Sequence, residues 1–189
     1  MTEEDIIRHY DIRGNYCKNR GDGAMQNLYL IGFMGTGKST VAKVFQEDYH
    51  MKLLEMDEEI VRQEKRPISE IFATDGEAYF RELETDLVRK IQAGSKQIVC
   101  CGGGTVLRPE NVAMIKKSGK VVLLRAKAET ILERVKSSSD RPLLNGNMNV
   151  EYIAGLMEKR RAIYENAADL VIDTDGKSAY EICKEIMGG

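Results

Sequence analysis

The chain has 189 residues, of which 42% are hydrophobic and 31% charged, the balance of one globular domain with an ordinary core. Its 28 Lys and Arg residues against 30 Asp and Glu residues give a net charge of −2, which argues against a general nucleic-acid binder. No apolar run approaches the ~20 residues of a membrane helix, and the N-terminus has no apolar signal core, so we expect neither a nucleic-acid partner nor a membrane.

The cysteines and histidines do not suggest a metal centre. Cys17, Cys100, Cys101 and Cys183 include no C-x-x-C pair, and the chain has only two histidines. We expect Cys100 and Cys101 to fill the end of a buried strand. Thiols of this kind suit a reducing cytoplasm, where we expect the protein to act.

The first 24 residues differ from the rest of the chain, because they carry no apolar stripe and glycines interrupt them at positions 14, 21 and 23. They are predicted to form a weakly ordered N-terminal extension, with a partner-binding arm as the alternative. A regular pattern then begins, so residues 25–189 are predicted to form a single domain.

Within that domain, short apolar runs alternate with helical patterns. Strands are predicted over residues 27–31, 52–56, 97–101, 120–124 and 170–173. Helices are predicted over residues 39–48, 58–64, 68–74, 77–92, 109–118, 128–136, 149–167 and 178–187, and residues 137–148 have the composition of a polar loop. Strand sequences such as VVLL and IVCC are apolar on both sides, as a parallel sheet between helices requires. The predicted fold is a three-layer α/β fold with a five-stranded parallel sheet and helices on both faces.

A glycine-rich loop follows the first predicted strand. Residues 32–39 read GFMGTGKS and match G-x-x-x-x-G-K-[ST] at every fixed position. Glycines allow the loop to curl so that several N–H groups meet one phosphate, and the next helix adds the positive end of its dipole. Lys38 is expected to reach the terminal phosphates, and Ser39 to ligate Mg²⁺. The other residues of this predicted nucleoside triphosphate site are Gly35, Thr36, Gly37 and Thr40.

The loop alone does not distinguish a kinase from a switch GTPase or an ATPase motor. The chain is short for a motor, and it has no guanine motif of the N-K-x-D type. A small-molecule kinase is therefore the favoured class.

Five further features follow along the chain. They are the segment Glu55-Met56-Asp57, the pair Phe80-Arg81, the glycines at 102–104, the RPLL sequence at 141–144 and the pair Lys159-Arg160. Together with LIGFMGTGKST at residues 30–40, this set resembles shikimate kinase from about residue 25 to the C-terminus.

The resemblance implies ATP-dependent phosphorylation of the 3-hydroxyl of shikimate, giving shikimate 3-phosphate and ADP. It implies that Arg81 and Arg160 bind the shikimate carboxylate, for which planar guanidinium groups are well suited. Asp57 would orient the 3-hydroxyl and accept its proton. Residues of about 57–84 would form the acceptor-binding region, with the shikimate ring packed on Gly102, Gly103 and Gly104.

The donor side follows from the same resemblance. Residues of about 136–148 would form a lid that excludes water and brings Arg141 to the transferred phosphoryl group. Arg134 would stack on the adenine, with Lys177 beside it. Where the family usually has aspartate this chain has Glu55, a longer carboxylate that we expect to hold Mg²⁺ or its bound water. The family resemblance also implies a monomer.

Each of these features has a plainer explanation. Asp57 can cap the following helix, and Arg81 can pair with Glu77 or Glu84 on its own helix. Arg160 and Arg161 can both be solvated, and only one of them is expected to be functional. The glycines at 102–104 can form a plain turn, and Arg141-Pro142 an ordinary loop. For the whole protein the alternatives are another small P-loop kinase, acting on gluconate or a nucleoside monophosphate, or an ATP-binding regulator without turnover.

Overall fold

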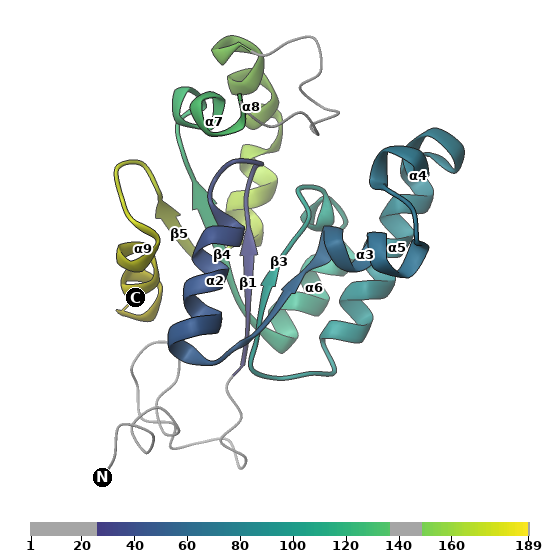
Figure 1. Cartoon of the computed structure of the whole chain (residues 1–189), viewed down its shortest axis with the longest axis horizontal. Helices are drawn as coiled ribbons and strands as arrows, with labels where there is room; N and C mark the ends of the chain where they lie inside the picture. The colour runs from purple at the N-terminus through teal and green to yellow at the C-terminus, as the bar shows by residue number, and fades with distance from the viewer. Residues whose placement is uncertain (1–25, 137–148, 189) are drawn as a thin grey trace.

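The structure is a computed structural model that describes residues 26–136 and 149–188. The predicted N-terminal extension and the lid with Arg141 lie outside these residues. Within them, five strands form one parallel sheet in the order β2-β3-β1-β4-β5 (Figure 1). The predicted α/β fold class is therefore confirmed.

The elements end within two residues of the predicted positions. The strands are β1 (Asn27–Ile31), β2 (Lys52–Glu55), β3 (Gln97–Cys100), β4 (Gly119–Arg125) and β5 (Leu170–Asp173). The helices are α2 (Lys38–Tyr49), α3 (Met56–Glu64), α4 (Ile68–Thr74), α5 (Gly76–Ile91), the 3₁₀ turn η1 (Thr105–Leu107), α6 (Pro109–Ser118), α7 (Ala128–Val135), α8 (Val150–Ala167) and α9 (Ala179–Gly188).

Both faces of the sheet are buried. Side chains alternate between the two faces of a strand, so Leu28 and Leu30 of β1 pack with α2 and α9. Tyr29 and Ile31 point the other way and pack with α3, α5 and α6. The inner strands β1, β3 and β4 are buried along nearly their whole length, as their apolar sequences require, whereas the edge strands β2 and β5 are partly exposed.

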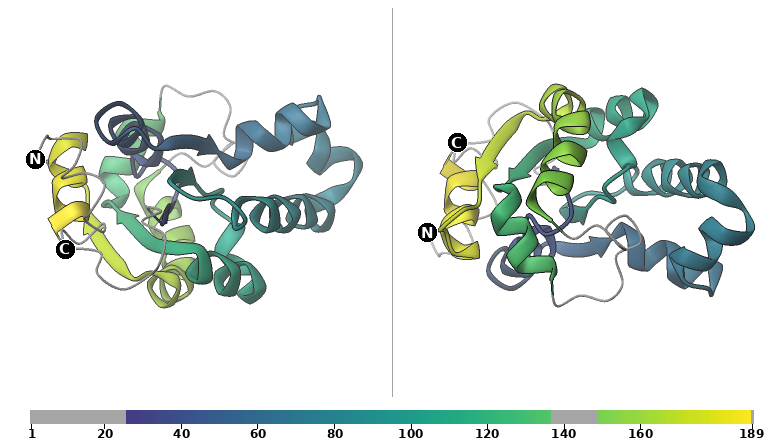
Figure 2. Two further views of the ribbon diagram at one scale, coloured as in Figure 1. Left: turned by 90° about the horizontal axis from the view of Figure 1, so that it is seen from below. Right: turned by 90° about the horizontal axis from the view of Figure 1, so that it is seen from above.

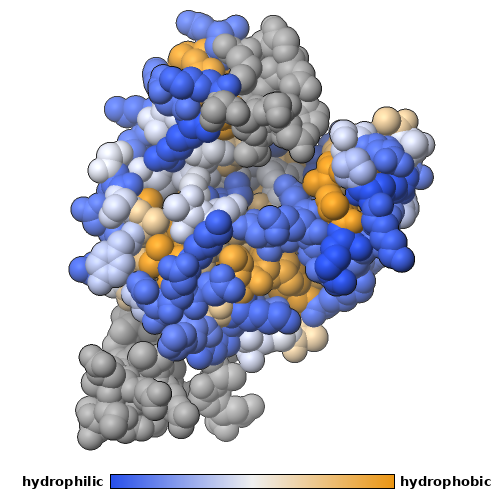
Figure 3. Space-filling view, in the orientation of Figure 1, coloured by the Kyte–Doolittle hydropathy of each residue, from blue (hydrophilic) through white to orange (hydrophobic). Residues whose placement is uncertain are grey.

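Two parts of the chain extend beyond the layers. Helices α3, α4 and α5 form a lobe that projects from one side (Figure 2), and its outer surface is mainly hydrophilic, with hydrophobic side chains where it meets the body (Figure 3). Helix α7 and the first part of α8 stand beyond the ends of β1 and β4, where Ile131, Val135 and Ile153 pack on Phe33 of the glycine-rich loop. The last part of α8 packs on the sheet through Tyr164 and Ala167.

Strand order and register place the functional segments together. Leu30 of β1 is in register with Cys100 of β3, which is in register with Glu55 of β2, so these three strands end at one level. Ligand contacts in open α/β sheets lie beyond the carboxyl ends of the strands. The glycine-rich loop after β1 therefore lies beside the glycine turn after β3, and next to that lies Asp57 after β2. No helix among the described residues has the length and apolar character needed to cross a membrane.

Candidate active site

The glycine-rich loop has the backbone geometry that its sequence predicts. Gly32, Gly35 and Gly37 have φ values of 139°, 74° and 97°, in the region that side-chain-bearing residues rarely adopt. At Gly35 a Cβ would also lie 2.9 Å from Cγ1 of Val135, so α7 leaves no room for a side chain. The hydroxyl of buried Thr36 donates to the Phe33 carbonyl at 2.8 Å, and this hydrogen bond stabilises the curved conformation of the loop. Helix α2 begins at Lys38, so its first N–H groups face the interior of the loop.

Lys38 bends back over this loop. Its Nζ donates to the carbonyls of Gly32 at 2.9 Å and Phe33 at 3.1 Å. Burial lowers the pKa of the ammonium group, and the nearby Asp57 and Glu55 carboxylates act in the opposite direction. Lys38 thus connects the phosphate side of the site electrostatically with the carboxylates at the end of β2 and the start of α3.

The turn of Gly102, Gly103 and Gly104 lies against polar side chains. A Cβ on Gly102 would lie 2.6 Å from Oε1 of Glu84 and 2.8 Å from Oδ1 of Asp57. A Cβ on Gly104 would overlap the guanidinium group of Arg81. The sequence suggested that a substrate ring needs this space, and the structure adds a second reason: the protein's own charged side chains fill it.

Arg81 makes both of the pairings that the sequence left open. Its Nη2 lies 2.7 Å from Glu77 and its Nη1 lies 2.6 Å from Glu84. The two carboxylates differ, because the side chain of Glu77 is 64% exposed and that of Glu84 is 1% exposed. Arg81 therefore has a fixed internal partner on one side and a solvent-facing partner on the other, and it still lies on the glycine turn.

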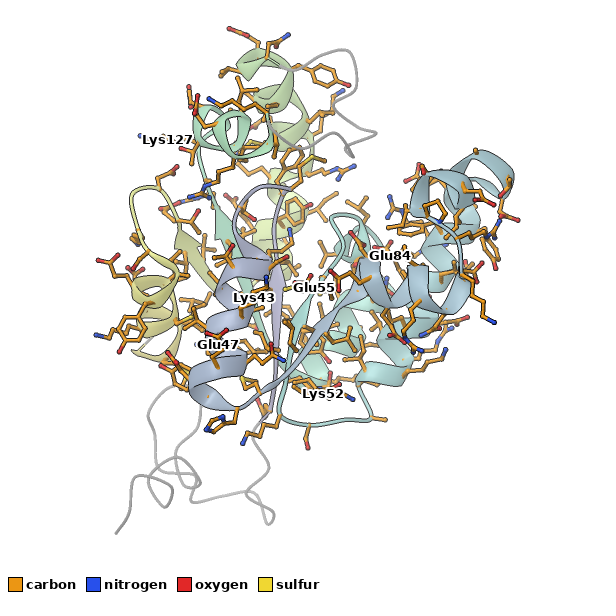
Figure 4. The ribbon with its side chains drawn as sticks, in the orientation of Figure 1. Lys43, Glu47, Lys52, Glu55, Glu84 and Lys127 are labelled. Atoms are coloured by element: carbon orange, nitrogen blue, oxygen red, sulfur yellow. The ribbon has the colours of Figure 1, made fainter. Side chains whose placement is uncertain are left out.

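Glu84 is a site residue that sequence reasoning named only as a possible partner of Arg81. One carboxylate oxygen accepts from Arg81 and the other from the Thr105 hydroxyl at 2.8 Å, and Figure 4 shows the side chain extending from α5 toward the sheet edge. Burial raises the pKa of this carboxyl group, while Arg81 and Thr105 lower it. The sequence does contain a signal for Glu84, because an acidic residue here stands beside Leu83 on the apolar stripe of a predicted helix.

Glu84→Gln is expected to change how stability depends on pH. Because the pKa of Glu84 is raised in the folded state, its contribution to the free energy of unfolding is greatest below the ordinary glutamate value of about 4.3 and is lost as pH rises through the folded pKa. The free energy of unfolding of the wild type minus that of Glu84→Gln should therefore fall across that window. Urea unfolding at a series of pH values measures this difference. If this difference in the free energy of unfolding stayed constant or rose with pH, the raised pKa of Glu84 would be contradicted.

Helix α8 brings Arg160 to the same turn. Its Nη1 donates to the Gly103 carbonyl at 3.4 Å, and the Tyr164 hydroxyl donates to the same oxygen at 2.6 Å. The neighbouring Arg161 pairs instead with Glu158 at 2.8 Å, and its side chain is 60% exposed. Of these two arginines, Arg160 is therefore the one that faces the glycine turn.

The two residues expected near the adenine are placed differently. Arg134 donates to the Gly35 carbonyl at 3.1 Å and to the hydroxyl and carbonyl of Thr174 at 3.2 and 3.3 Å, so it lies between the glycine-rich loop and the segment after β5. Lys177 pairs with Glu185 of α9 at 2.8 Å. The structure thus brings Arg134, but not the Lys177 ammonium group, into contact with the glycine-rich loop.

The expected metal ligands have suitable chemistry. Ser39 is exposed in the first turn of α2, and Glu55 ends β2 at the same sheet edge (Figure 4). Hydroxyl and carboxylate oxygens suit Mg²⁺, which is usually held by few protein ligands together with phosphates and water. Within residues 26–136 and 149–188, no group of three or more His, Cys, Asp or Glu residues is placed to hold a metal.

The cysteines near this edge are buried, as predicted. Burial raises the pKa of the Cys100 and Cys101 thiols, and Glu55 adds to the effect at Cys100. Both thiols therefore remain protonated at neutral pH.

A phosphate loop after the central strand, with carboxylates and arginines gathered at the same edge of a parallel sheet, defines a P-loop kinase that acts on a small molecule. The family model for shikimate kinase matches residues 34–188. The chain belongs to the shikimate kinase family.

Individual relatives agree with this assignment. A shikimate kinase of Persephonella marina is 42% identical over 164 residues, which cover 87% of this chain and 98% of the relative. The structure of shikimate kinase from Acinetobacter baumannii in complex with shikimate has a TM-score of 0.80 at 30% identity, covering 86% of this chain and 90% of that one. Shikimate kinase from Aquifex aeolicus has a TM-score of 0.70 at 34% identity, covering 85% and 93%.

Proposed function

We propose that this protein transfers the terminal phosphoryl group of ATP to the 3-hydroxyl of shikimate, giving shikimate 3-phosphate and ADP. The observation that carries the proposal is that Asp57, Arg81 and Arg160, from three different helices, meet at one glycine turn beside the phosphate loop. Membership of the shikimate kinase family supports the same reaction.

On the acceptor side, Arg81 and Arg160 bind the shikimate carboxylate. The exposed Glu77 is the partner of Arg81 that a substrate carboxylate can displace, whereas buried Glu84 keeps the guanidinium group in place. The shikimate ring then lies on Gly102, Gly103 and Gly104. Asp57 orients the 3-hydroxyl and takes its proton as the phosphoryl group is transferred. In a loose transition state this positioning contributes more than the basicity of Asp57.

On the donor side, the loop amides of Gly35, Thr36 and Gly37, with Ser39 and Thr40, bind the phosphates. Lys38 leaves its two loop carbonyls and turns to the terminal phosphate. Ser39, together with Glu55 acting directly or through a metal-bound water, would hold Mg²⁺, which would neutralise charge on the phosphates. Arg134 contacts the adenine, with Lys177 near it, and Arg141, which lies outside the described residues, covers the phosphoryl group when the lid at 136–148 closes.

The test is a coupled ADP-release assay with shikimate, quinate, gluconate and nucleoside monophosphates offered in parallel. We expect strong stimulation by shikimate alone. ADP release driven by gluconate or a monophosphate would favour another small-molecule kinase, and bound ATP without stimulation by any acceptor would favour a regulator. Either result, ADP release driven by another acceptor or bound ATP without stimulation, would contradict the proposal.

We place the enzyme in the cytoplasm as a monomer built on residues 25–189, without a nucleic-acid or membrane partner, in agreement with its net charge of −2. Light scattering on the purified chain tests the oligomeric state.

A further inference from the structure

A cavity of about 250 Å³ lies behind the phosphate loop, between β4, α7 and α8. Most of its wall is apolar and includes Phe33, Leu123, Ala126 and Met157. Of the residues assigned above to phosphates or substrate, Thr36 alone lines it, and the other lining residues come from Phe33, from β4 and the segment after it, from the start of α7 and from α8. The cavity therefore shares only Thr36 with the residues assigned to the reaction.

The charged groups around the cavity are already paired. Arg161 lies 2.8 Å from Glu158, and Arg125 lies 3.6 Å from Glu165 and 2.6 Å from Asp173. An ionic ligand would have to compete with these pairs, whereas a neutral apolar one would not. The carboxylates of Glu158 and Glu165 can still accept a hydrogen bond from one ligand hydroxyl.

Two lining residues also contact the active site, one through its backbone carbonyl and the other through its side-chain hydroxyl. The carbonyl of Phe33 accepts from Lys38 at 3.1 Å and from Thr36 at 2.8 Å. The hydroxyl of Tyr164 donates to the Gly103 carbonyl at 2.6 Å. A molecule packed against these two side chains therefore touches one residue of the donor side and one that supports the acceptor turn.

We propose that this cavity is a second small-molecule site, which takes a neutral two-ring aromatic compound with one hydroxyl group, and that its occupancy is coupled to nucleotide binding. The volume suits a compound of this size, because an apolar cavity of about 150 Å³ accommodates benzene. A cavity of about 250 Å³ has room for a second fused ring. The coupling follows from the Phe33 carbonyl, since bound phosphates draw Lys38 away from it.

The binding test uses 2-naphthol, titrated into the full chain without ATP or shikimate and followed by calorimetry. In Ala154→Phe a large side chain stands at the cavity mouth, where Ala154 is exposed and the change needs no buried space. The matched control is Ile163→Phe, on the same helix, 40% exposed and outside the cavity lining. We expect Ala154→Phe to weaken 2-naphthol at least about tenfold and the control to leave affinity within about twofold. Absence of binding, or equal binding to both variants, would overturn the site.

The coupling test repeats the titration with saturating ADP, whose own binding is checked in the same experiment. We expect the affinity for 2-naphthol to change by about fivefold or more, and the affinity for ADP to change by the same factor when 2-naphthol is present. Unchanged affinity with ADP bound would overturn the coupling. Neither titration involves phosphoryl transfer, so these results are independent of whether shikimate proves to be the acceptor.

Discussion

Lys38→Ala is expected to lower kcat by about 10³-fold or more, because a positive charge aimed at the transferred phosphoryl group is among the largest contributions to such reactions. The Lys38 ammonium group donates to the carbonyls of Gly32 and Phe33 within its own loop. Alanine also has the highest helix propensity, which suits the first residue of α2. The loss should therefore be catalytic, with the fold intact.

The matched control is Lys43→Ala, an exposed lysine on the same helix (Figure 4). It removes the same charge without touching the phosphate loop, and its kcat should stay within about twofold of the wild type. The ADP-release assay and thermal unfolding are measured on both variants. If Lys38→Ala kept wild-type kcat with shikimate, the role assigned to this loop in catalysis would be wrong.

Arg81→Ala is expected to raise the KM for shikimate by about 100-fold, because it removes a charge-assisted fork from the substrate carboxylate. The KM for ATP should stay within about twofold, since Arg81 contacts the glycine turn and not the phosphate loop. The substitution also leaves Glu84 buried without its cation, at a cost of about 3–5 kcal/mol in stability. Stability must therefore be measured together with kinetics.

Arg81→Lys separates the two effects. Lysine keeps a cation beside Glu84 but lacks the planar fork, so the protein should stay folded while the KM for shikimate still rises at least about tenfold. Arg89→Ala on the same helix is the control, because Arg89 pairs on the surface with Asp86 at 2.5 Å. If Arg81→Lys kept the wild-type KM for shikimate, the planar guanidinium group of Arg81 would not be needed to bind the substrate carboxylate.

The glycine turn after β3 shows how tightly the acceptor residues constrain one another. Asp57, Glu84 and Arg81 occupy positions that a Cβ on Gly102 or Gly104 would need. Arg81 and Glu84 form an ion pair at this turn, and the Thr105 hydroxyl donates a hydrogen bond to the Glu84 carboxylate. The glycines therefore serve the internal charge network in addition to any substrate ring.

Local patterns in the amino-acid sequence were sufficient for the phosphate loop and for the fold class. The glycines, Lys38 and the flanking strand and helix are contiguous, so spacing alone predicts their geometry. The parallel sheet follows from strands that are apolar on both sides, because such strands must be covered on both faces.

Tertiary structure decided what depends on distant segments and on helix rotation. Arg160 and Arg161 are adjacent, and a helix turns about 100° per residue, so local pattern alone does not distinguish them. The family resemblance assigned Arg160, and the packing of α8 places Arg160 at Gly103 and Arg161 on the surface. The role of Glu84 depends on Thr105 in another element, and the cavity behind the loop depends on the way β4, α7 and α8 meet. Such contacts join residues far apart in the chain, and no local pattern encodes which of them come together.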